Sequence, residues 1–149
     1  MKPILVLNGP NMNLLGYREP EIYGAITLSG LEEVIRAEAG LLGVPVELFQ
    51  SNHEGSILDR LHEGRGRLRG ALLNPGGLTH TSVALRDAVA ALDYPVIEVH
   101  ISNILAREPF RQTDLIAPVC RGVVMGLGIV GYRVGLRAMV AVTEGSETA

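Results

Sequence analysis

The sequence alternates short apolar runs with longer segments of helical periodicity, and this alternation restricts the chain to a small set of folds. Short continuous apolar runs are typical of strands buried on both faces of a parallel sheet. Five such runs occupy residues 4–7, 44–49, 70–73, 96–99 and 122–125. Between them, apolar residues recur about every 3.6 positions in segments 28–42, 57–61 and 83–92. The sequence therefore predicts five βα units.

Five units in a chain of 149 residues predict a single α/β domain, residues 1–149. A five-stranded parallel sheet with helices on both faces makes a three-layer sandwich, and its most economical strand order is flavodoxin-like. The last helix is expected from about residue 129 to 142. Residues 143–149 are small and polar, and we expect them to form a disordered tail.

Charge and cysteine usage exclude several classes of function. The formal net charge of -3 and the lack of a long basic stripe argue against nucleic-acid binding. No apolar run approaches the ~18 residues of a membrane span. The single cysteine excludes a disulfide framework and fits a reducing, cytoplasmic compartment. The cysteine and four histidines lack zinc-site spacing, and the only lysine is Lys2, so we expect no metal, Schiff base or other cofactor.

Polar clusters follow three of the expected strands. Ligands of open parallel sheets bind outside the carboxyl ends of the strands, so residues in these positions are candidates for a binding site. The clusters are residues 8–11, 74–77 and 100–103. We expect them to converge at one edge of the sheet.

The first cluster opens a long connection, NGPNMNLLGYREPEIYG, over residues 8–24. Typical βα connections have about 2–6 residues, and longer ones are often lids or binding loops. The loop carries Arg18 and Tyr23. A phenol, with a pKa of about 10, is a poor base until a cation favours its phenolate, and Arg18 could supply that cation. The alternative is a surface arginine and a half-buried tyrosine that hold the loop in place.

Glu98 and His100 stand two residues apart in an expected strand, so their side chains leave the same face. A carboxylate beside an imidazole fixes the tautomer and favours the protonated ring, which suits a general acid. A purely structural pair at the end of a strand is the alternative. Their place at the expected ligand edge favours catalysis.

Two further segments add polar candidates. In NPGGLTHTS, residues 74–82, the hydroxyl side chains are explained as helix caps, whereas His80 is not and would point toward the same edge as His100. In SNILAREPFRQTD, Arg107 and Arg111 stand four residues apart. They form either an ordinary charged helical turn or a site for a substrate with hydroxyl or carboxylate groups.

Gly126, Gly128 and Gly131 match the pattern GxGxxG of dinucleotide-binding proteins. That pattern belongs to a first βαβ unit, in which a second strand and an acidic residue follow after about 20 positions. No strand is expected after this one. We interpret the three glycines as positions where a helix packs closely on the sheet.

Taken together, the motifs NGPNMNLLGYREPEIYG, QSNHEG, NPGGLTHTSVALRDA, IEVHISN and AREPFR resemble the type II 3-dehydroquinate dehydratases of the shikimate and quinate pathways. The resemblance extends from residue 7 to about residue 136, in the same order and without a large gap. It implies dehydration of 3-dehydroquinate to 3-dehydroshikimate by anti elimination through an enolate, without a metal or Schiff base. It also implies a homo-oligomer, a dodecamer built from trimers.

The resemblance also implies roles for individual residues. Tyr23 would be the base, with Arg18 favouring its phenolate. Asn11 would hold a water that donates to the enolate oxygen. His100, oriented by Glu98, would protonate the departing hydroxyl.

The remaining implied residues bind the substrate. Ser102 and the backbone of Ile101 match a carboxylate site, and Asp87 resembles a residue that reaches in from a neighbouring subunit. The positions that match contacts to the ring hydroxyls are Asn74, His80 and Arg111.

This chain departs from the resemblance after AREPFR, where the family commonly has a His and Ser stretch and this sequence has Gln112, Thr113 and Asp114. Two other hypotheses remain compatible with the residues. One is a non-catalytic module that binds flavin or another small ligand on the same fold. The other is a catalytically silent assembly protein.

Overall fold

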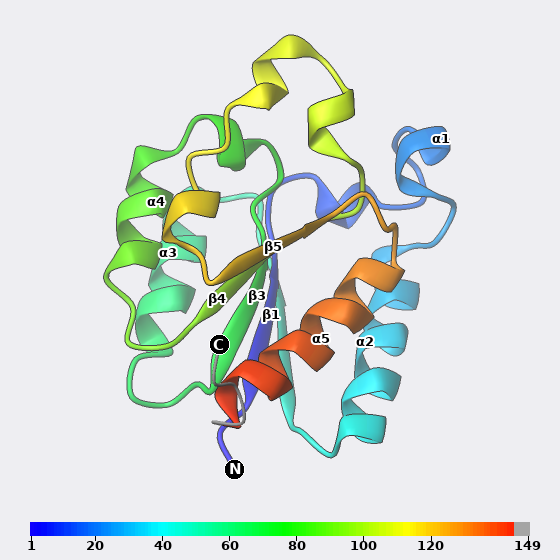
Figure 1. The fold of residues 1–149 in the computed structure, drawn as a ribbon. Coiled ribbons are helices and arrows are strands. Elements are labelled where there is room, and N and C mark those ends of the chain that lie inside the picture. Colours follow the sequence, from blue (N-terminus) through cyan, green and yellow to red (C-terminus); the bar gives the residue numbers. More distant parts are fainter. Residues whose placement is uncertain (145–149) are drawn as a thin grey trace.

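A parallel five-stranded sheet forms the centre of the molecule (Figure 1). In the computed structural model, which describes residues 1–144, the strands lie in the order β2-β1-β3-β4-β5, and all neighbouring pairs are parallel. The strands are β1 (Ile4–Asn8), β2 (Val46–Gln50), β3 (Gly70–Asn74), β4 (Val96–His100) and β5 (Gly122–Met125). This is the flavodoxin-like order that the sequence predicts, and the α/β fold class is confirmed.

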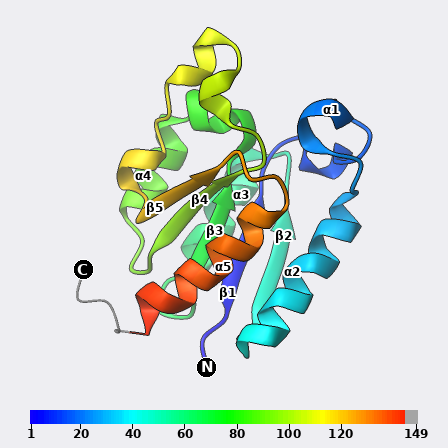
Figure 2. The ribbon, with the colours of Figure 1, turned by 45° about the vertical axis from the view of Figure 1, so that its right-hand side comes forward.

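Two pairs of helices cover the two faces of the sheet (Figures 1 and 2). Helices α2 (Leu28–Leu42) and α5 (Val130–Thr143) lie on one face, and α3 (Glu54–Glu63) and α4 (Val83–Ala90) lie on the other. Successive strand residues point to opposite faces, so each strand contributes to two separate cores. The strand residues in the α2 and α5 core include Ile4, Val6, Leu72, Ile97 and Val99, and those in the α3 and α4 core include Leu5, Leu7, Ala71, Leu73 and Val96.

The strand boundaries differ from the expected ones for local reasons. β2 begins at Val46 rather than at residue 44, because the N–H of Val44 still donates to Ala39 O at the end of α2 (3.1 Å) and Pro45 has no N–H. Every expected strand except β5 gains one polar residue at its carboxyl end, and these residues are Asn8, Gln50, Asn74 and His100. An apolar run cannot reveal such a residue, although Asn74 and His100 line a cavity at this edge of the sheet.

Helix α5 ends one residue later than expected. Thr143 lies in the helix, where its hydroxyl donates to Met139 O and accepts from Arg69 Nε, both at 2.6 Å, so its assignment to the tail is wrong. The rest of the expected tail, residues 145–149, lies outside the described residues. The start of β1 and the last turn of α5 lie at the end of the molecule opposite the loops that follow the strands (Figure 1).

The three glycines after β5 have two different roles. Gly131 lies against Val99 and Val124 of the sheet, as expected for close helix packing. Gly126 and Gly128 have φ angles of 83° and 61°, so they shape the turn between β5 and α5 instead. Within residues 1–144, no helix combines the length and apolar character needed to cross a bilayer.

Candidate active site

The loops after β1, β3 and β4 enclose a cavity of about 280 Å³ at the carboxyl edge of the sheet. Ten of the twelve residues that the sequence singles out line it. They are Asn11, Arg18, Tyr23, Asn74, His80, His100, Ile101, Ser102, Arg107 and Arg111. The two others are Glu98, which is buried behind His100, and Asp87, which is exposed on α4 and does not line the cavity of its own chain.

Contacts to its backbone hold the loop after β1 against neighbouring segments. Asn11 adopts a left-handed conformation, with a φ of 70°, and its N–H donates to Asn52 Oδ1 (2.9 Å). The Gln50 side chain donates to Gly9 O (3.2 Å). Gly9 lies so close to the loop after β3 that a Cβ there would be 2.8 Å from Pro75 O. These contacts fix the position of Asn11 at the mouth of the cavity.

Two arginines contact Tyr23, which ends the short helix α1 (Pro20–Tyr23). The guanidinium carbon of Arg18 lies 5.0 Å from the ring centroid, which makes it a cation–π neighbour. Arg107 is closer to the reactive atom, because its Nη1 donates to the Tyr23 hydroxyl oxygen at 2.7 Å. The sequence suggested only Arg18 for this task. Arg107 lies 84 positions away, and no spacing rule links two loops that meet only in the folded chain.

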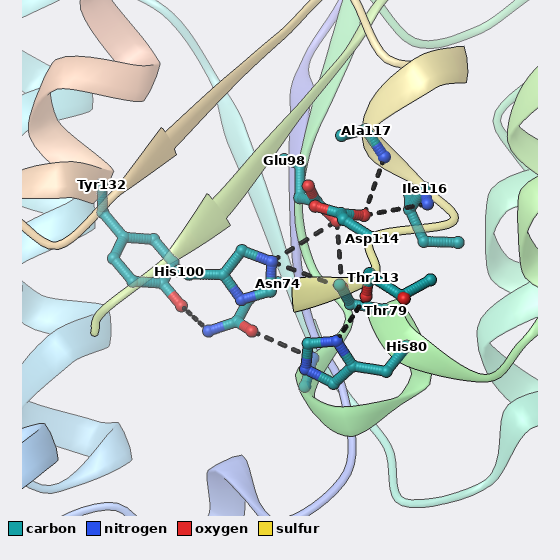
Figure 3. Close-up of polar contacts among 11 residues, drawn as sticks. Asn74, Thr79, His80, Glu98, His100, Thr113, Asp114, Ile116, Ala117 and Tyr132 are labelled. Carbon is teal, nitrogen blue, oxygen red and sulfur yellow. Dashed lines mark hydrogen bonds and ion pairs between the residues drawn. The ribbon is translucent and has the colours of Figure 1, made fainter. Parts of the chain in front are cut away.

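His100 lies at the end of a buried polar chain (Figure 3). Its Nε2 is 3.4 Å from Glu98 Oε1, as expected for residues on one face of a strand. The Thr79 hydroxyl donates to the same Glu98 oxygen (3.0 Å) and lies 3.3 Å from His100 Nε2. Thr79 and Glu98 are fully buried, and His100 is 5% exposed. The sequence interpretation of Thr79 as a helix cap is wrong; Ser82 accepts the capping hydrogen bond of α4.

Burial shifts the pKa values of the titratable side chains in this set of polar contacts. It lowers the pKa of His100 to about 4, with Asp114 opposing the shift and Arg111 adding to it. It also raises the pKa of Glu98. The sequence predicts that Glu98 favours the protonated imidazole; in the structure the loss of hydration outweighs that attraction.

Asp114 joins this chain and was not a predicted site residue. Its Oδ1 accepts hydrogen bonds from the N–H groups of Ile116 and Ala117, both at 2.9 Å. Burial, followed by its contact with Glu98, raises the pKa of Asp114 to about 6. An irregular loop separates Asp114 from the Glu98–His100 pair in the sequence. Sequence periodicity cannot predict a contact made by such a loop.

Donor atoms of Glu98, His100 and Asp114 lie within 4.8 Å of one another, a spacing that one divalent cation could span. Thr79 and two backbone N–H groups already donate to the two carboxyls, so hydrogen bonding accounts for much of their coordinating capacity. We therefore assign none of the three as a metal ligand.

The residues expected to bind substrate are held by neighbours that leave part of each side chain toward the cavity. Asn74 Nδ2 donates to the Tyr132 hydroxyl (2.9 Å), and Asn74 Oδ1 accepts from Gly76 N (3.1 Å). His80 Nδ1 lies 2.7 Å from Thr113 O (Figure 3). The charged side chains among the described lining residues, apart from titratable histidines, are those of Arg18, Arg107 and Arg111. This makes the cavity suited to an anion with several hydroxyl groups.

Comparisons with known proteins agree with this arrangement. Residues 2–140 match the model of the dehydroquinase class II family. The chain is 52% identical over 147 residues to a 3-dehydroquinate dehydratase of Halalkalibacterium halodurans, covering 99% of each chain. It is 51% identical over 135 residues to a catabolic 3-dehydroquinase of Emericella nidulans, covering 91% of this chain and 88% of that one. A type II dehydroquinase structure from Butyrivibrio crossotus superposes with a TM-score of 0.90 and 42% identity, over 93% of this chain and 97% of that one.

Proposed function

This chain belongs to the dehydroquinase class II family, and on that premise we propose that it dehydrates 3-dehydroquinate to 3-dehydroshikimate by anti elimination through an enolate. It is a hydro-lyase. The observation that carries the proposal is that Tyr23 and His100, a base and an acid from different loops, line one cavity with three arginines. The substrate is a carboxylate with several hydroxyl groups, which matches that lining.

Tyr23 removes the proton alpha to the ketone. Its hydroxyl oxygen accepts a 2.7 Å hydrogen bond from Arg107, and both Arg107 and Arg18 lie over its ring. A guanidinium donor stabilises a phenolate more than a phenol, because only the phenolate carries a negative charge. Arg107 therefore assists the base directly, and Arg18 adds positive charge at the ring.

Residues of other loops stabilise the enolate and protonate the departing hydroxyl. Asn11 holds a water that donates to the enolate oxygen, a role supported by its fixed position at the mouth of the cavity. His100 protonates the hydroxyl as it leaves as water. Glu98 and Thr79 contact Nε2 of His100, which orients the ring and leaves Nδ1 for the cavity.

The remaining cavity residues hold the substrate. Ser102 and the backbone of Ile101 bind its carboxylate, close to Arg107, whose Nη1 donates to Ser102 Oγ (3.3 Å). The residues that hold its ring hydroxyls are Asn74, His80 and Arg111.

We also propose that the protein is a cytoplasmic homo-oligomer, a dodecamer built from trimers. Asp87 supports an assembled site, because it is exposed on α4 rather than turned into the cavity of its own chain. In a trimer it would reach the cavity of a neighbouring copy. One relative is named 3-dehydroquinate dehydratase, and another is named catabolic 3-dehydroquinase. The reaction therefore serves either the shikimate or the quinate pathway.

Ultraviolet absorbance of the conjugated enone tests the reaction. The protein is expected to produce this absorbance from 3-dehydroquinate, and no rise at high protein concentration would refute the proposal. Tyr23→Phe should lower turnover by orders of magnitude with little change in substrate affinity, because the phenyl ring keeps the shape and loses the base. Tyr17→Phe is the matched control, since Tyr17 is on the same loop and 79% exposed. Near-normal turnover of Tyr23→Phe would show that another group is the base.

A further inference from the structure

Two carboxyl groups, rather than one, lie behind His100 (Figure 3). Donor atoms of Glu98, His100 and Asp114 all lie within 4.8 Å of one another, and we call these three residues the acid cluster. Glu98 is fully buried, and Asp114 is partly buried in the loop before β5. The sequence and the proposed mechanism account for Glu98 and leave Asp114 without a function.

The hydrogen bonds of the two carboxyls leave one oxygen of each without a donor. Glu98 Oε1 accepts from Thr79, and Asp114 Oδ1 accepts from two backbone N–H groups. Glu98 Oε2 and Asp114 Oδ2 are buried and have no hydrogen-bond partner within residues 1–144, although an oxygen of each carboxyl lies within 4.8 Å of the other carboxyl. Two carboxylates this close repel each other and offer only acceptors, whereas a proton on one of them removes the repulsion and supplies a donor.

Within residues 1–144, the neighbouring side chains supply little compensation for two negative charges. Besides His100 of the cluster itself, the titratable and charged groups that face it are Cys120 and Arg111. Burial raises the pKa of Cys120 to about 12, so this thiol is neutral at physiological pH. Arg111 lies on the cavity side of His100, where its Nε is paired with Glu108 Oε2 (2.7 Å). A proton within the cluster is the remaining way to reduce its charge.

We propose that Asp114 is a positioning residue for the acid step: with Glu98 it retains one proton between the two carboxyls at a pH where a free carboxyl is ionised, and this proton supports the one that His100 delivers. The inference rests on the proposed function. In the step, an N–H bond of His100 breaks and its electron pair stays on the ring. The C–O bond of the substrate breaks, its pair goes to the oxygen, and the new O–H bond completes a water. At the same time the O–H bond of the carboxyl pair breaks, its electron pair stays on the carboxylate oxygen, and the proton forms a new N–H bond at Nε2 of His100, so the ring stays neutral. The two carboxyls fall from one proton to none, and solvent restores it.

Asp114 lies within QTD, residues 112–114, in the irregular segment between β4 and β5. A second acidic group raises the proton affinity of the cluster, because removing the last proton leaves two adjacent negative charges. Glu98 alone would release that proton at a lower pH.

The pH profile of kcat/KM tests this role with Asp114→Asn. The amide keeps an oxygen for the N–H groups of Ile116 and Ala117 while removing the charge. The alkaline limb should move to lower pH by about one unit, which lowers kcat/KM on that limb by about tenfold. Asp93→Asn is the control, because Asp93 also accepts a backbone N–H, from Gly66 (2.9 Å), but lies before β4 at the other end of the sheet. Asp114→Ser is the second variant if the first does not fold.

Infrared spectroscopy of the carboxyl C=O stretch gives a readout independent of turnover. The wild type and Asp93→Asn should show a protonated carboxyl at pH 5.5, below the pKa of about 6 for Asp114, and Asp114→Asn and Glu98→Gln should lack it. A protonated band without any turnover would refute the dehydratase assignment and leave the shared proton standing. Turnover with no such band, or an unmoved alkaline limb in Asp114→Asn, would overturn the inference. Loss of turnover on chelator treatment together with no band would show that a cation, not a proton, neutralises the cluster.

Discussion

Tyr132→Phe tests how the core supports the substrate-binding edge. Tyr132 is fully buried in α5, and its hydroxyl donates to Asn8 Oδ1 (2.5 Å) while accepting from Asn74 Nδ2 (2.9 Å). Asn8 and Asn74 end adjacent strands and are 3% and 4% exposed. One hydroxyl therefore satisfies a buried acceptor and a buried donor at the same time.

The change removes a single oxygen, so Asn8 Oδ1 and Asn74 Nδ2 both lose their hydrogen bond to Tyr132. A buried polar group that loses its partner costs about 1–3 kcal/mol. Asn74 Nδ2 retains only a long contact to Met12 Sδ (3.5 Å). We expect the free energy of unfolding to fall by about 2–4 kcal/mol. We also expect KM for 3-dehydroquinate to rise by about threefold to tenfold, because the Asn74 amide is no longer held.

Tyr94→Phe is the matched control. Tyr94 is 7% exposed, and its hydroxyl donates to Leu61 O (2.6 Å). Leu61 O also accepts from Gly64 N (3.1 Å), so it keeps a partner and the loss should be about 1 kcal/mol. Urea denaturation at one fixed protein concentration gives the two free energies, and steady-state kinetics gives KM. Equal losses in the two variants, with KM unchanged in both, would refute the reasoning.

Three further predictions concern backbone approach, thiol reactivity and pH. Gly9→Ala places a Cβ 2.8 Å from Pro75 O, so it should lower stability by about 1–3 kcal/mol and raise KM; a thermal melt and KM equal to wild type would contradict this. Burial raises the pKa of Cys120 to about 12, so a thiol reagent at pH 8 should label the folded protein slowly and the urea-unfolded chain quickly; equal rates would contradict burial of the thiol. Folding raises the pKa of Asp114 from 3.8 to about 6, so the folded state binds more proton than the unfolded state in that interval. The stability of wild type relative to Asp114→Asn should therefore fall as pH rises from about 4 to 6, and urea titrations with a constant difference would contradict it.

The fold was predictable because parallel strands have a strong local signature. Runs such as residues 70–73 are buried on both faces, and β3 is buried along its whole length. The start of β2 could not be predicted, because it depends on a hydrogen bond from Val44 back to α2. The short helix α1 was missed within the long loop, since four residues carry too little periodicity to reveal a helix.

The site was predictable where residues directly follow a strand. Topology brings the ends of β1, β3 and β4 together, so residues such as Asn74 and His100 could be assigned to one edge in advance. The sequence offered Arg107 only as a possible substrate contact, and it assigned no site role to Thr79 or Asp114. Their contacts with Tyr23 and Glu98 join distant positions through irregular loops, 84 positions apart for Arg107 and 19 for Thr79. Sequence patterns describe neighbours within an element, whereas these contacts depend on how loops pack.

The arrangement of the two chain ends has a practical consequence. β1 begins, and α5 finishes, at the amino-terminal edge of the sheet, on the far side of the molecule from the cavity (Figure 1). An affinity tag or a tether to a solid support joined at the start of β1 would thus be attached a full strand length from the place where substrate enters. Immobilised protein of this kind should retain the catalytic rate of the free protein in solution.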